Sequence, residues 1–309
     1  MPPNSMDIGP STTAVVTGAG SGIGRSIVLC LASKGAAVVV ADIDEDAALK
    51  VAFEAKELGG RSVGVKVDVS KLEDVERLAS VAYDHFGSVE VLVNNAGVTM
   101  RPFRASWDTS LEDFKWTMDV NFWGVLYGHH VFVPRMRQSP GRKHIVNTSS
   151  MSTLVSFAGH SAYSASKAAV DGLSNAAREE LKTQNIGLSL LHPGPVRTRI
   201  VTSERLRPEQ DTSEARKVKP WSDYLQNGGN NTGRVTPSTT VTADDPSFPE
   251  HPYHYINPDE CGRFVLEGIQ QNKPVILTHP VQVAELDVRR NDIISGAPVR
   301  VSEAEVTLK

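Results

Sequence analysis

The chain has 309 residues, of which 40% are hydrophobic and 22% charged, and its net charge is −4. This length is enough for one large α/β domain or two small ones, and the composition is that of an ordinary soluble globular protein. The slightly acidic balance argues against an extended nucleic-acid surface or an anionic membrane as partner.

The two ends of the sequence carry little signal. The start, MPPNSMDIGPSTT, lacks the basic residues and apolar core of a signal peptide, and no apolar run approaches the ~20 residues that span a bilayer. Cys30 and Cys261 lie in helical patterns, where packing is their ordinary role. We therefore predict a reduced, cytoplasmic protein with a flexible terminus at 1–11 and a tail at 290–309.

The first pattern along the chain is a strand, a glycine-rich turn, a helix and a second strand. The apolar run 12–17 leads into Gly18-Ala-Gly-Ser-Gly-Ile-Gly24, a helix follows from Ile23 to about Ser33, and the run 36–41 ends at Asp42. This order is typical of a dinucleotide-binding βαβ unit. The glycines let the backbone approach a pyrophosphate, and the helix N-terminus offers it free N–H groups.

Asp42 indicates which dinucleotide is bound. It stands 18 residues past Gly24, where a carboxylate accepts hydrogen bonds from the adenosine ribose and repels a 2′-phosphate. NAD is therefore predicted, and NADP is less favoured. Arg25 is the counter-evidence, because a nearby cation would weaken this exclusion. A second role for Asp42 is to cap the helix that begins near Glu45.

The alternation of strands and helices continues to the end of the chain. Strands are predicted at 63–67, 89–93, 186–191 and 274–278, and helices at 72–86, 111 to about 136, 161 to about 182, and 258–271. With the strand that begins at Ile145, this pattern predicts a single domain over 12–289. Its fold class is α/β: a doubly wound (Rossmann) parallel sheet of about seven strands with helices on both faces.

Two polar residues stand out in these elements. Asp68 follows a strand at the edge where α/β sheets bind ligands, so it would meet the adenine, although it could equally form a turn. Asn121 lies inside the long helix from 111, where asparagine is a mediocre helix former, so we expect it to make a specific hydrogen bond.

The stretch 145–167, IVNTSSMSTLVSFAGHSAYSASK, carries the candidate chemistry. Tyr163 and Lys167 are four residues apart on a predicted helix and share one face. An ammonium near a phenol favours the phenolate, so Lys167 is expected to lower the tyrosine pKa and make Tyr163 a proton acceptor. Ser150 would hydrogen-bond the oxygen that loses its proton. Taken alone, this spacing is also common in ordinary helices.

The region 199–256 breaks the alternation with six prolines and a polar stretch. A long connection of this kind is functional or disordered. We predict that its aromatic ends form a substrate lid and that 227–245 is mobile, the alternative being a surface insertion. No cluster of arginines is predicted at the reacting carbon, which disfavours small carboxylated or phosphorylated substrates. Arg101, Arg104, Arg197 and Arg199 weigh against that exclusion.

In combination these motifs resemble one known family. They are Thr17–Gly24, Asp68-Val69, Asn94-Asn-Ala-Gly97, Asn121, Ser150, Tyr163-Ser-Ala-Ser-Lys167 and Pro193-Gly-Pro-Val-Arg-Thr198. Over roughly residues 12–200 the chain resembles the single-domain, NAD-dependent branch of the short-chain dehydrogenases/reductases. Phe132-Val-Pro-Arg-Met136 and the segment after Thr198 are also similar to bacterial aryl-ether Cα-dehydrogenases.

The resemblance implies an alcohol dehydrogenase that needs no metal. Tyr163 would take the alcohol proton while hydride leaves for nicotinamide C4, Lys167 would also bind the nicotinamide ribose, and Asn121 would position a water. Ser150 would orient the substrate oxygen, with Ser149 and Ser152 as the alternatives to test. The implied cofactor contacts are Gly18, Ser21, Gly22, Ile23, Gly24, Asp42, Asp68, Val69, Asn95, Ala96, Gly97, Tyr163, Lys167, Pro193, Gly194, Val196 and Thr198. A homodimer or homotetramer is the implied assembly.

Two alternatives remain beside an NAD-dependent dehydrogenase of an apolar or aromatic secondary alcohol. One is a catalytically silent NAD-binding regulatory or scaffolding protein, although such proteins typically lack the Tyr or the Lys. The other is an extended-branch epimerase or dehydratase, which the glycine spacing disfavours. The sequence leaves aryl alcohols, steroids, terpenoids and acyl chains equally open as substrates.

Overall fold

The computed structural model describes residues 6–155, 157–208, 219–225, 254–280 and 283–296. The chain divides into two compact units, Met1–Thr278 and His279–Lys309. The second unit contains one helix, α9 (Val283–Ser295), among its described residues, which the sequence pattern does not predict. All other elements belong to the first unit. The central part of the predicted lid, 227–245, lies outside the described residues.

The first unit is built on a seven-stranded parallel sheet with the order β3-β2-β1-β4-β5-β6-β7. The strands are β1 (Thr13–Thr17), β2 (Ala37–Asp42), β3 (Arg61–Lys66), β4 (Val91–Asn94), β5 (Lys143–Thr148), β6 (Ile186–His192) and β7 (Val275–Leu277). The predicted doubly wound sheet is thereby confirmed. Because the order reverses between β1 and β4, a crevice for ligands is expected where these two strands end.

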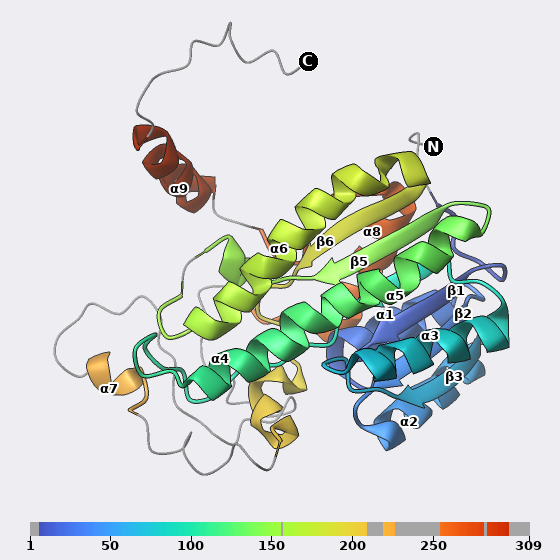
Figure 1. Cartoon of the computed structure of the whole chain (residues 1–309), viewed down its shortest axis with the longest axis horizontal. Coiled ribbons are helices and arrows are strands. Elements are labelled where there is room, and N and C mark those ends of the chain that lie inside the picture. The colour runs from blue at the N-terminus through green and yellow to red at the C-terminus, as the bar shows by residue number, and fades with distance from the viewer. Residues whose placement is uncertain (1–5, 156, 209–218, 226–253, 281–282, 297–309) are drawn as a thin grey trace, which may run out of the picture. The chain divides into compact units, whose positions relative to one another are not determined.

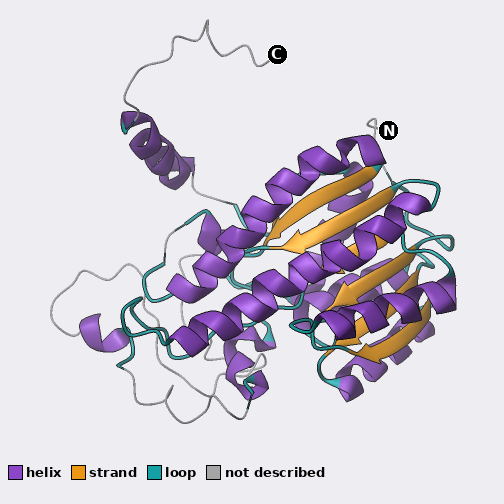
Figure 2. Ribbon diagram, in the orientation of Figure 1, coloured by secondary structure: helices purple, strands orange, loops and turns teal. Residues whose placement is uncertain are grey.

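Helices cover both faces of this sheet (Figures 1 and 2). One face carries α1 (Gly22–Ala32), α2 (Glu45–Glu57) and α8 (Pro258–Gln271), and the other carries α3 (Leu72–Phe86), α5 (Gly124–Gln138) and α6 (Ser161–Leu181). The shorter helices are α4 (Leu111–Met118) and α7 (Ser222–Leu225). Among the described helices, none has the length and apolar character needed to traverse a bilayer.

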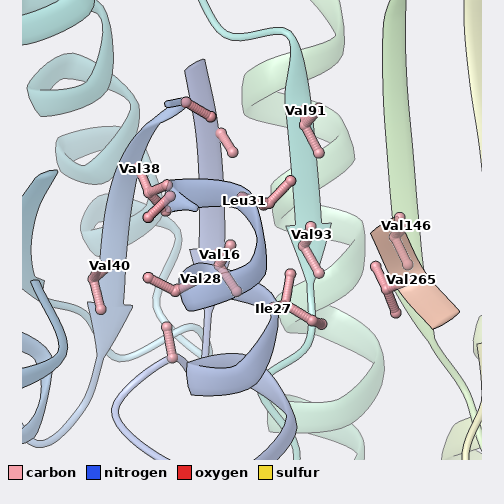
Figure 3. Close-up of a cluster of buried hydrophobic side chains, with 14 of the residues drawn as sticks. Val16, Ile27, Val28, Leu31, Val38, Val40, Val91, Val93, Val146 and Val265 are labelled. Carbon is pink, nitrogen blue, oxygen red and sulfur yellow. The ribbon is translucent and has the colours of Figure 1, made fainter. Parts of the chain in front are cut away.

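Alternating side chains of the central strands fill two cores. Val16, Val38, Val93 and Val146 point to one face, where Figure 3 shows them with side chains of α1 and α8. Residues of α2 belong to the same core. Their chain neighbours Val15, Val39, Leu92 and Ile145 pack on the helices of the opposite face. This two-residue period, with apolar residues on both faces, is the pattern of a sheet buried on both sides. Packing on both faces fixes the strands relative to one another, so their carboxyl ends lie side by side along one edge of the sheet.

The predicted long helix 111–136 is wrong in one respect. It is divided into α4, a π-helical segment at Asp119–Trp123, and α5. The π segment surrounds the buried Asn121, and it is followed by Gly124, where an added Cβ would lie 2.8 Å from Val69 Cγ2. The helix also continues through the exposed Pro134 to Gln138. A local widening of this kind is frequent at functional sites.

Candidate active site

The glycine-rich turn lies at the point where β1 and β4 diverge. Gly18 has φ +61°, and an added Cβ would lie 2.6 Å from the Ala96 Cα. Gly22 has φ +54°, and its Cβ would lie 2.9 Å from Thr198 Cγ2. Both positions therefore require glycine for conformation and for space. The turn is pressed between the segments that follow β4 and β6.

The N-terminus of α1 is suited to an anion. Ser21 occupies the N-cap position but its side chain makes no capping hydrogen bond, and the first turn, which includes Ile23, holds no acidic residue. By contrast, α2, α3 and α4 each carry two acidic residues in their first turns. An uncapped helix start without a carboxylate leaves N–H groups and a positive dipole end for a phosphate. The residues present thus fit the pyrophosphate of a dinucleotide.

Asp42 lies at the end of β2, beside this turn. Its Oδ2 accepts a hydrogen bond from Gly20 N at 2.8 Å and its Oδ1 accepts one from Asp44 N at 3.0 Å. The alternative role as cap of α2 is wrong, because Asp44 holds that position and accepts from Ala47 N. The carboxylate of Asp42 is instead fixed against the glycine turn.

The cation that was expected to weaken NAD selectivity is engaged elsewhere. Arg25 Nε pairs with Glu54 Oε2 at 2.7 Å. Arg205 is the arginine that the sequence pattern missed. Burial lowers its pKa, Arg199 lowers it further, and the charges of Asp42 and Asp44 oppose this shift. Arg205 is therefore within electrostatic reach of the predicted ribose site.

Asp68 makes local hydrogen bonds after β3. Its Oδ1 accepts from the N–H and the hydroxyl of Ser70, at 3.1 and 2.6 Å, and its Oδ2 lies 3.6 Å from Lys71 Nζ. The turn-forming role is therefore present in the structure. Val69 is buried against Gly124 at the π segment. An adenine contact at Asp68 and Val69 stays a prediction.

The segment after β4 holds the glycine turn in place. The Thr17 hydroxyl accepts hydrogen bonds from Asn95 N and Ala96 N at 3.0 and 3.1 Å. Asn95 Nδ2 donates to the carbonyls of Thr17 and Gly18. The Asn95 side chain thus holds the turn, and the Thr17 hydroxyl, at the start of the glycine motif, fixes the backbone of Asn95 and Ala96.

Asn94 serves the central sheet. Its Nδ2 donates to Asn147 Oδ1 at 2.8 Å, and Asn147 in turn hydrogen-bonds Ser174 Oγ and His129 Nε2. Burial lowers the pKa of His129. This buried polar network links β4, β5, α5 and α6 and explains why asparagine ends β4.

Ser150 and Tyr163 meet at the carboxyl end of β5. The Tyr163 hydroxyl is hydrogen-bonded to the Ser150 side chain, while Ser152 N donates to Ser150 Oγ at 3.1 Å. The two alternative serines do not make this contact: Ser149 Oγ donates to Lys167 O at 3.4 Å, and Ser152 Oγ is buried without a hydrogen-bond partner in the described structure. The structure therefore brings Ser150 to the tyrosine.

The expected effect of Lys167 on the tyrosine is not found. Burial raises the pKa of Tyr163, and the hydrogen bond from Ser150 only partly opposes this. Lys167 Nζ donates to Thr148 O at 2.9 Å and lies 5.8 Å from the centre of the Tyr163 ring. Burial also lowers the pKa of Lys167 to about 8. Desolvation penalises the charged form of both groups and is the largest cause of each pKa shift.

Asn121 is fully buried beside these groups. Its Oδ1 accepts from Val98 N at 2.8 Å, and its Nδ2 donates to Val98 O and to Ser166 Oγ. A Cβ on Gly97 would lie 3.2 Å from Lys167 Nζ and 3.3 Å from Asn121 Oδ1. Gly97 thus allows the lysine and the asparagine to approach the same point.

The loop after β6 faces the glycine turn. Pro193 O accepts from Met151 N at 3.0 Å, and Gly194 N donates to Thr278 Oγ1 at 2.9 Å. Val196 forms a parallel bridge with Ile256 in which Pro195 O and Arg197 N make the hydrogen bonds. This pattern does not use the backbone N–H and C=O of Val196. Thr198 Oγ1 caps the 3₁₀ segment Arg199–Leu206.

Asp171 is a site residue that sequence reasoning missed. Burial raises its pKa, but hydrogen bonding, chiefly with His192 Nε2 at 3.3 Å, outweighs this effect, so its pKa lies below the usual value. Asp171 acts electrostatically to raise the pKa of Lys167, four residues earlier in α6. The i, i+4 spacing of Lys167 and Asp171 on one helix face was the available signal.

The described ends of the predicted lid lie against an aromatic wall. Trp221 N donates to Phe103 O at 2.7 Å, and a Cβ on Gly159 would lie 3.2 Å from Trp221 Cβ. The rings of Phe103 and His160 have centres 3.8 Å apart, and those of His160 and Tyr163 5.9 Å. This wall, Phe103–His160–Tyr163, leads from the segment after β4 to the tyrosine.

The buried ammonium of Lys167 predicts a pH-dependent stability. Its pKa is about 8 in the folded chain against 10.5 ordinarily, so between these values the unfolded chain binds more protons. The free energy of unfolding should then rise with pH across this window, by about 2 to 3 kcal/mol relative to Lys167→Met, which does not titrate. Urea unfolding of both proteins from about pH 7 to about 10.5 measures the difference. A constant difference would contradict a depressed lysine pKa.

Comparison with known proteins places the chain in a family. The model of the short chain dehydrogenases matches residues 12–209. The chain belongs to the short-chain dehydrogenase family and is an oxidoreductase. It is 39% identical over 188 residues to 1-deoxy-11-beta-hydroxypentalenate dehydrogenase of Streptomyces exfoliatus, covering 61% of this chain and 68% of that protein. It is 37% identical over 188 residues to cyclohexanol dehydrogenase of Acinetobacter sp. strain SE19, covering 61% and 74%.

Solved structures give the same result for the fold. A short chain dehydrogenase/reductase from Burkholderia phymatum in complex with NAD has a TM-score of 0.79 and 32% identity, covering 96% of this chain and 99% of that one. LigD of Sphingobium sp. strain SYK-6, in its apo form, has a TM-score of 0.71 and 25% identity, covering 95% and 100%.

Proposed function

We propose that this protein oxidises a secondary alcohol on an apolar or aromatic body to the ketone, with NAD as hydride acceptor, and catalyses the reverse reaction in principle. The convergence of Ser150, Tyr163 and Lys167 at one point is the observation that carries this proposal. It lies at the carboxyl end of β5, next to the crevice between β1 and β4, where sheets of this class bind ligands.

The cofactor would lie along that crevice. The N–H groups at the start of α1 would hold the pyrophosphate, the Asp42 carboxylate the adenosine ribose, and the unused backbone groups of Val196 with Thr198 the carboxamide. Asp68, Val69, Ala96, Pro193 and Gly194 would complete the contacts. When bound, NAD supplies the hydride acceptor at nicotinamide C4 and carries a positive charge in its oxidised ring.

Tyr163 would take the proton of the alcohol. Because burial raises the tyrosine pKa, the phenolate needs nearby positive charge and hydrogen-bond donors. Ser150 supplies a donor, which would also orient the substrate oxygen. Lys167 supplies an ammonium whose charge is supported by Asp171. The carbinol C–H bond breaks as hydride leaves, and the O–H proton passes to Tyr163.

Asn121 would connect this proton to solvent through a water near Lys167. Its side chain already binds Val98 and Ser166, so we place the water contact on its main chain. A π segment shifts backbone hydrogen bonds by one residue, which makes a main-chain carbonyl available inside a helix. The closeness of Gly97 to Lys167 Nζ and Asn121 Oδ1 supports this arrangement.

The proposed substrate class is supported by the aromatic side chains beside Tyr163 and by the named substrates of two related proteins. Phe103 and Trp221 supply apolar surface along the wall that leads through His160 to the tyrosine. The named substrates of two relatives, cyclohexanol and a hydroxypentalenate, are cyclic alcohols. A cytoplasmic, reducing location belongs to the same proposal, because Cys30 and Cys261 are both unpaired thiols.

A homodimer or homotetramer is part of this proposal. Ala165, Ala168, Gly172 and Ala176 form an exposed face of small residues on α6, and Trp123 in the neighbouring π segment is 41% exposed. Small residues allow two helices to pack closely, and a buried aromatic ring would add apolar area. Light scattering should give a mass that is a multiple of the 33.4 kDa chain. A monomer at micromolar concentration would contradict this assembly.

The proposed activity is tested by the absorbance of reduced nicotinamide with NAD and then NADP across cyclic, aryl, steroid and aliphatic secondary alcohols. Turnover with NAD on one class supports the dehydrogenase and identifies its substrate. Binding of NAD, seen as a thermal shift, without turnover of any alcohol would favour the alternative of a silent NAD-binding regulatory or scaffolding protein.

A further inference from the structure

Among the described residues, Arg104 and Arg207 are paired with one buried carboxylate. Asp113 is fully buried and contacts the Nη1 of Arg104 and, at 2.7 Å, the Nη2 of Arg207. Arg207 Nε also lies 2.7 Å from Glu204 Oε2. Buried charges in proteins are normally paired in this way, because desolvation of an isolated charge is costly. The two guanidinium groups therefore have a structural explanation.

Arg101 differs from these two in its charge partner, because among the described residues no carboxylate forms an ion pair with its guanidinium. Its Nε is also buried without a hydrogen-bond partner. The Glu204 carboxylate accepts a hydrogen bond from the Arg101 backbone N–H at 3.1 Å, but it pairs with the guanidinium of Arg207 and not with that of Arg101. Burial lowers the pKa of Arg101, and Tyr255 alone opposes this electrostatically. Arg101 thus carries a charge that the described structure does not neutralise.

The Arg101 guanidinium stands at the far end of the aromatic wall. Its central carbon lies 3.9 Å from the centre of the Phe103 ring, from which the wall continues through His160 to Tyr163. The ring face covers the flat side of the guanidinium but accepts none of its N–H donors in the plane. Those donors match the two oxygens of a carboxylate.

We propose that Arg101 binds a carboxylate of the substrate, at the end of an apolar body whose carbinol carbon lies at Tyr163. This inference rests on the proposed function and narrows it from apolar alcohols in general to apolar hydroxy acids. It also narrows the sequence-based exclusion of carboxylated substrates to small ones. Small carboxylated substrates stay disfavoured, because the cation is separated from the tyrosine by the rings of Phe103 and His160. A carboxylate on a larger skeleton can reach it.

The test compares two alcohols that differ only in charge: a decalin secondary alcohol with a carboxylate on its second ring, and the methyl ester of the same compound. The kcat and KM of both are measured with NAD for the native protein, Arg101→Gln and Arg101→Lys. Arg135→Gln is the matched control, because Arg135 is an exposed arginine on α5 that contacts Tyr83 and lies outside the site.

The native protein should prefer the acid over the ester, and Arg101→Gln should lower kcat/KM for the acid by about tenfold to a hundredfold, mainly through KM. The ester should be turned over equally by both proteins. Arg101→Lys keeps the charge without the paired donors and should retain part of the preference, and Arg135→Gln should retain all of it. Thermal unfolding checks that each variant is folded.

The outcomes separate the two proposals. Turnover of the ester without preference for the acid, or an equal effect of Arg101→Gln on both compounds, would overturn the carboxylate site and leave the dehydrogenase standing. Turnover of neither compound, nor of any alcohol in the wider panel, would overturn the proposed function and this inference with it.

Discussion

Replacing Tyr163 with phenylalanine is expected to lower kcat by about a hundredfold to ten-thousandfold, the range over which positioned general acids and bases act. The substitution removes only the hydroxyl that is hydrogen-bonded to Ser150. The apolar ring and its contact with His160 remain, so the wall of the site should be preserved. Activity with the best alcohol of the panel gives the result, and NAD binding, measured by thermal shift, should be unchanged.

Tyr83→Phe is the matched control for this experiment. The Tyr83 hydroxyl is also buried, has no hydrogen-bond partner in the described structure, and lies on α3, away from the site. Burial raises the pKa of Tyr83 to about 12, so it is not a proton acceptor near neutral pH. The control should retain full activity. Normal turnover by Tyr163→Phe would show that another group is the base.

Replacing Asp42 with asparagine is expected to reduce the preference for NAD over NADP by at least about tenfold. A carboxylate beside a 2′-phosphate is repelled by several kcal/mol at the effective dielectric of a protein surface. Asparagine removes this charge, while Arg205 would remain within electrostatic reach of the site to attract the phosphate. The ratio of kcat/KM for the two cofactors, at one alcohol concentration, measures the effect.

Asp44→Asn is the control for Asp42→Asn. It removes the same charge two residues away, at the exposed cap of α2, and asparagine is itself a good N-cap. Its cofactor ratio should stay near that of the native protein. If Asp42→Asn leaves the ratio unchanged, or if both variants shift it equally, a group other than Asp42 selects the cofactor.

The sheet and most helices were predictable because their signals are local. Buried strands such as 12–17 and 36–41 are apolar on both faces, and the limits of α3 and α8 agree with the pattern. The glycine turn has the spacing and φ values that its function requires. Residues 6–11, for which a flexible terminus was predicted, contain Met6 and Ile8, which are buried in the core. Two isolated apolar residues give no periodic signal.

The site was harder to predict, because its electrostatics depend on burial. A tyrosine and a lysine at i and i+4 indicate a favourable pair, yet the structure buries Lys167, half-buries Tyr163 and points Lys167 Nζ at Thr148 O. The Asp113 network joins Arg104, Arg207 and Glu204 from segments about a hundred residues apart. No local sequence pattern predicts these ion pairs, so the sequence does not distinguish the arginines that are paired from Arg101.

The most direct test of the central claim follows the hydrogen atom itself. A secondary alcohol from the active class, with deuterium on its carbinol carbon, is incubated with the protein and NAD. The reduced cofactor is then isolated, and its mass is measured by mass spectrometry. Direct hydride transfer predicts one deuterium in every reduced cofactor and a ketone that has lost it. Reduced cofactor without deuterium, or ketone formation without cofactor reduction, would contradict the dehydrogenase mechanism.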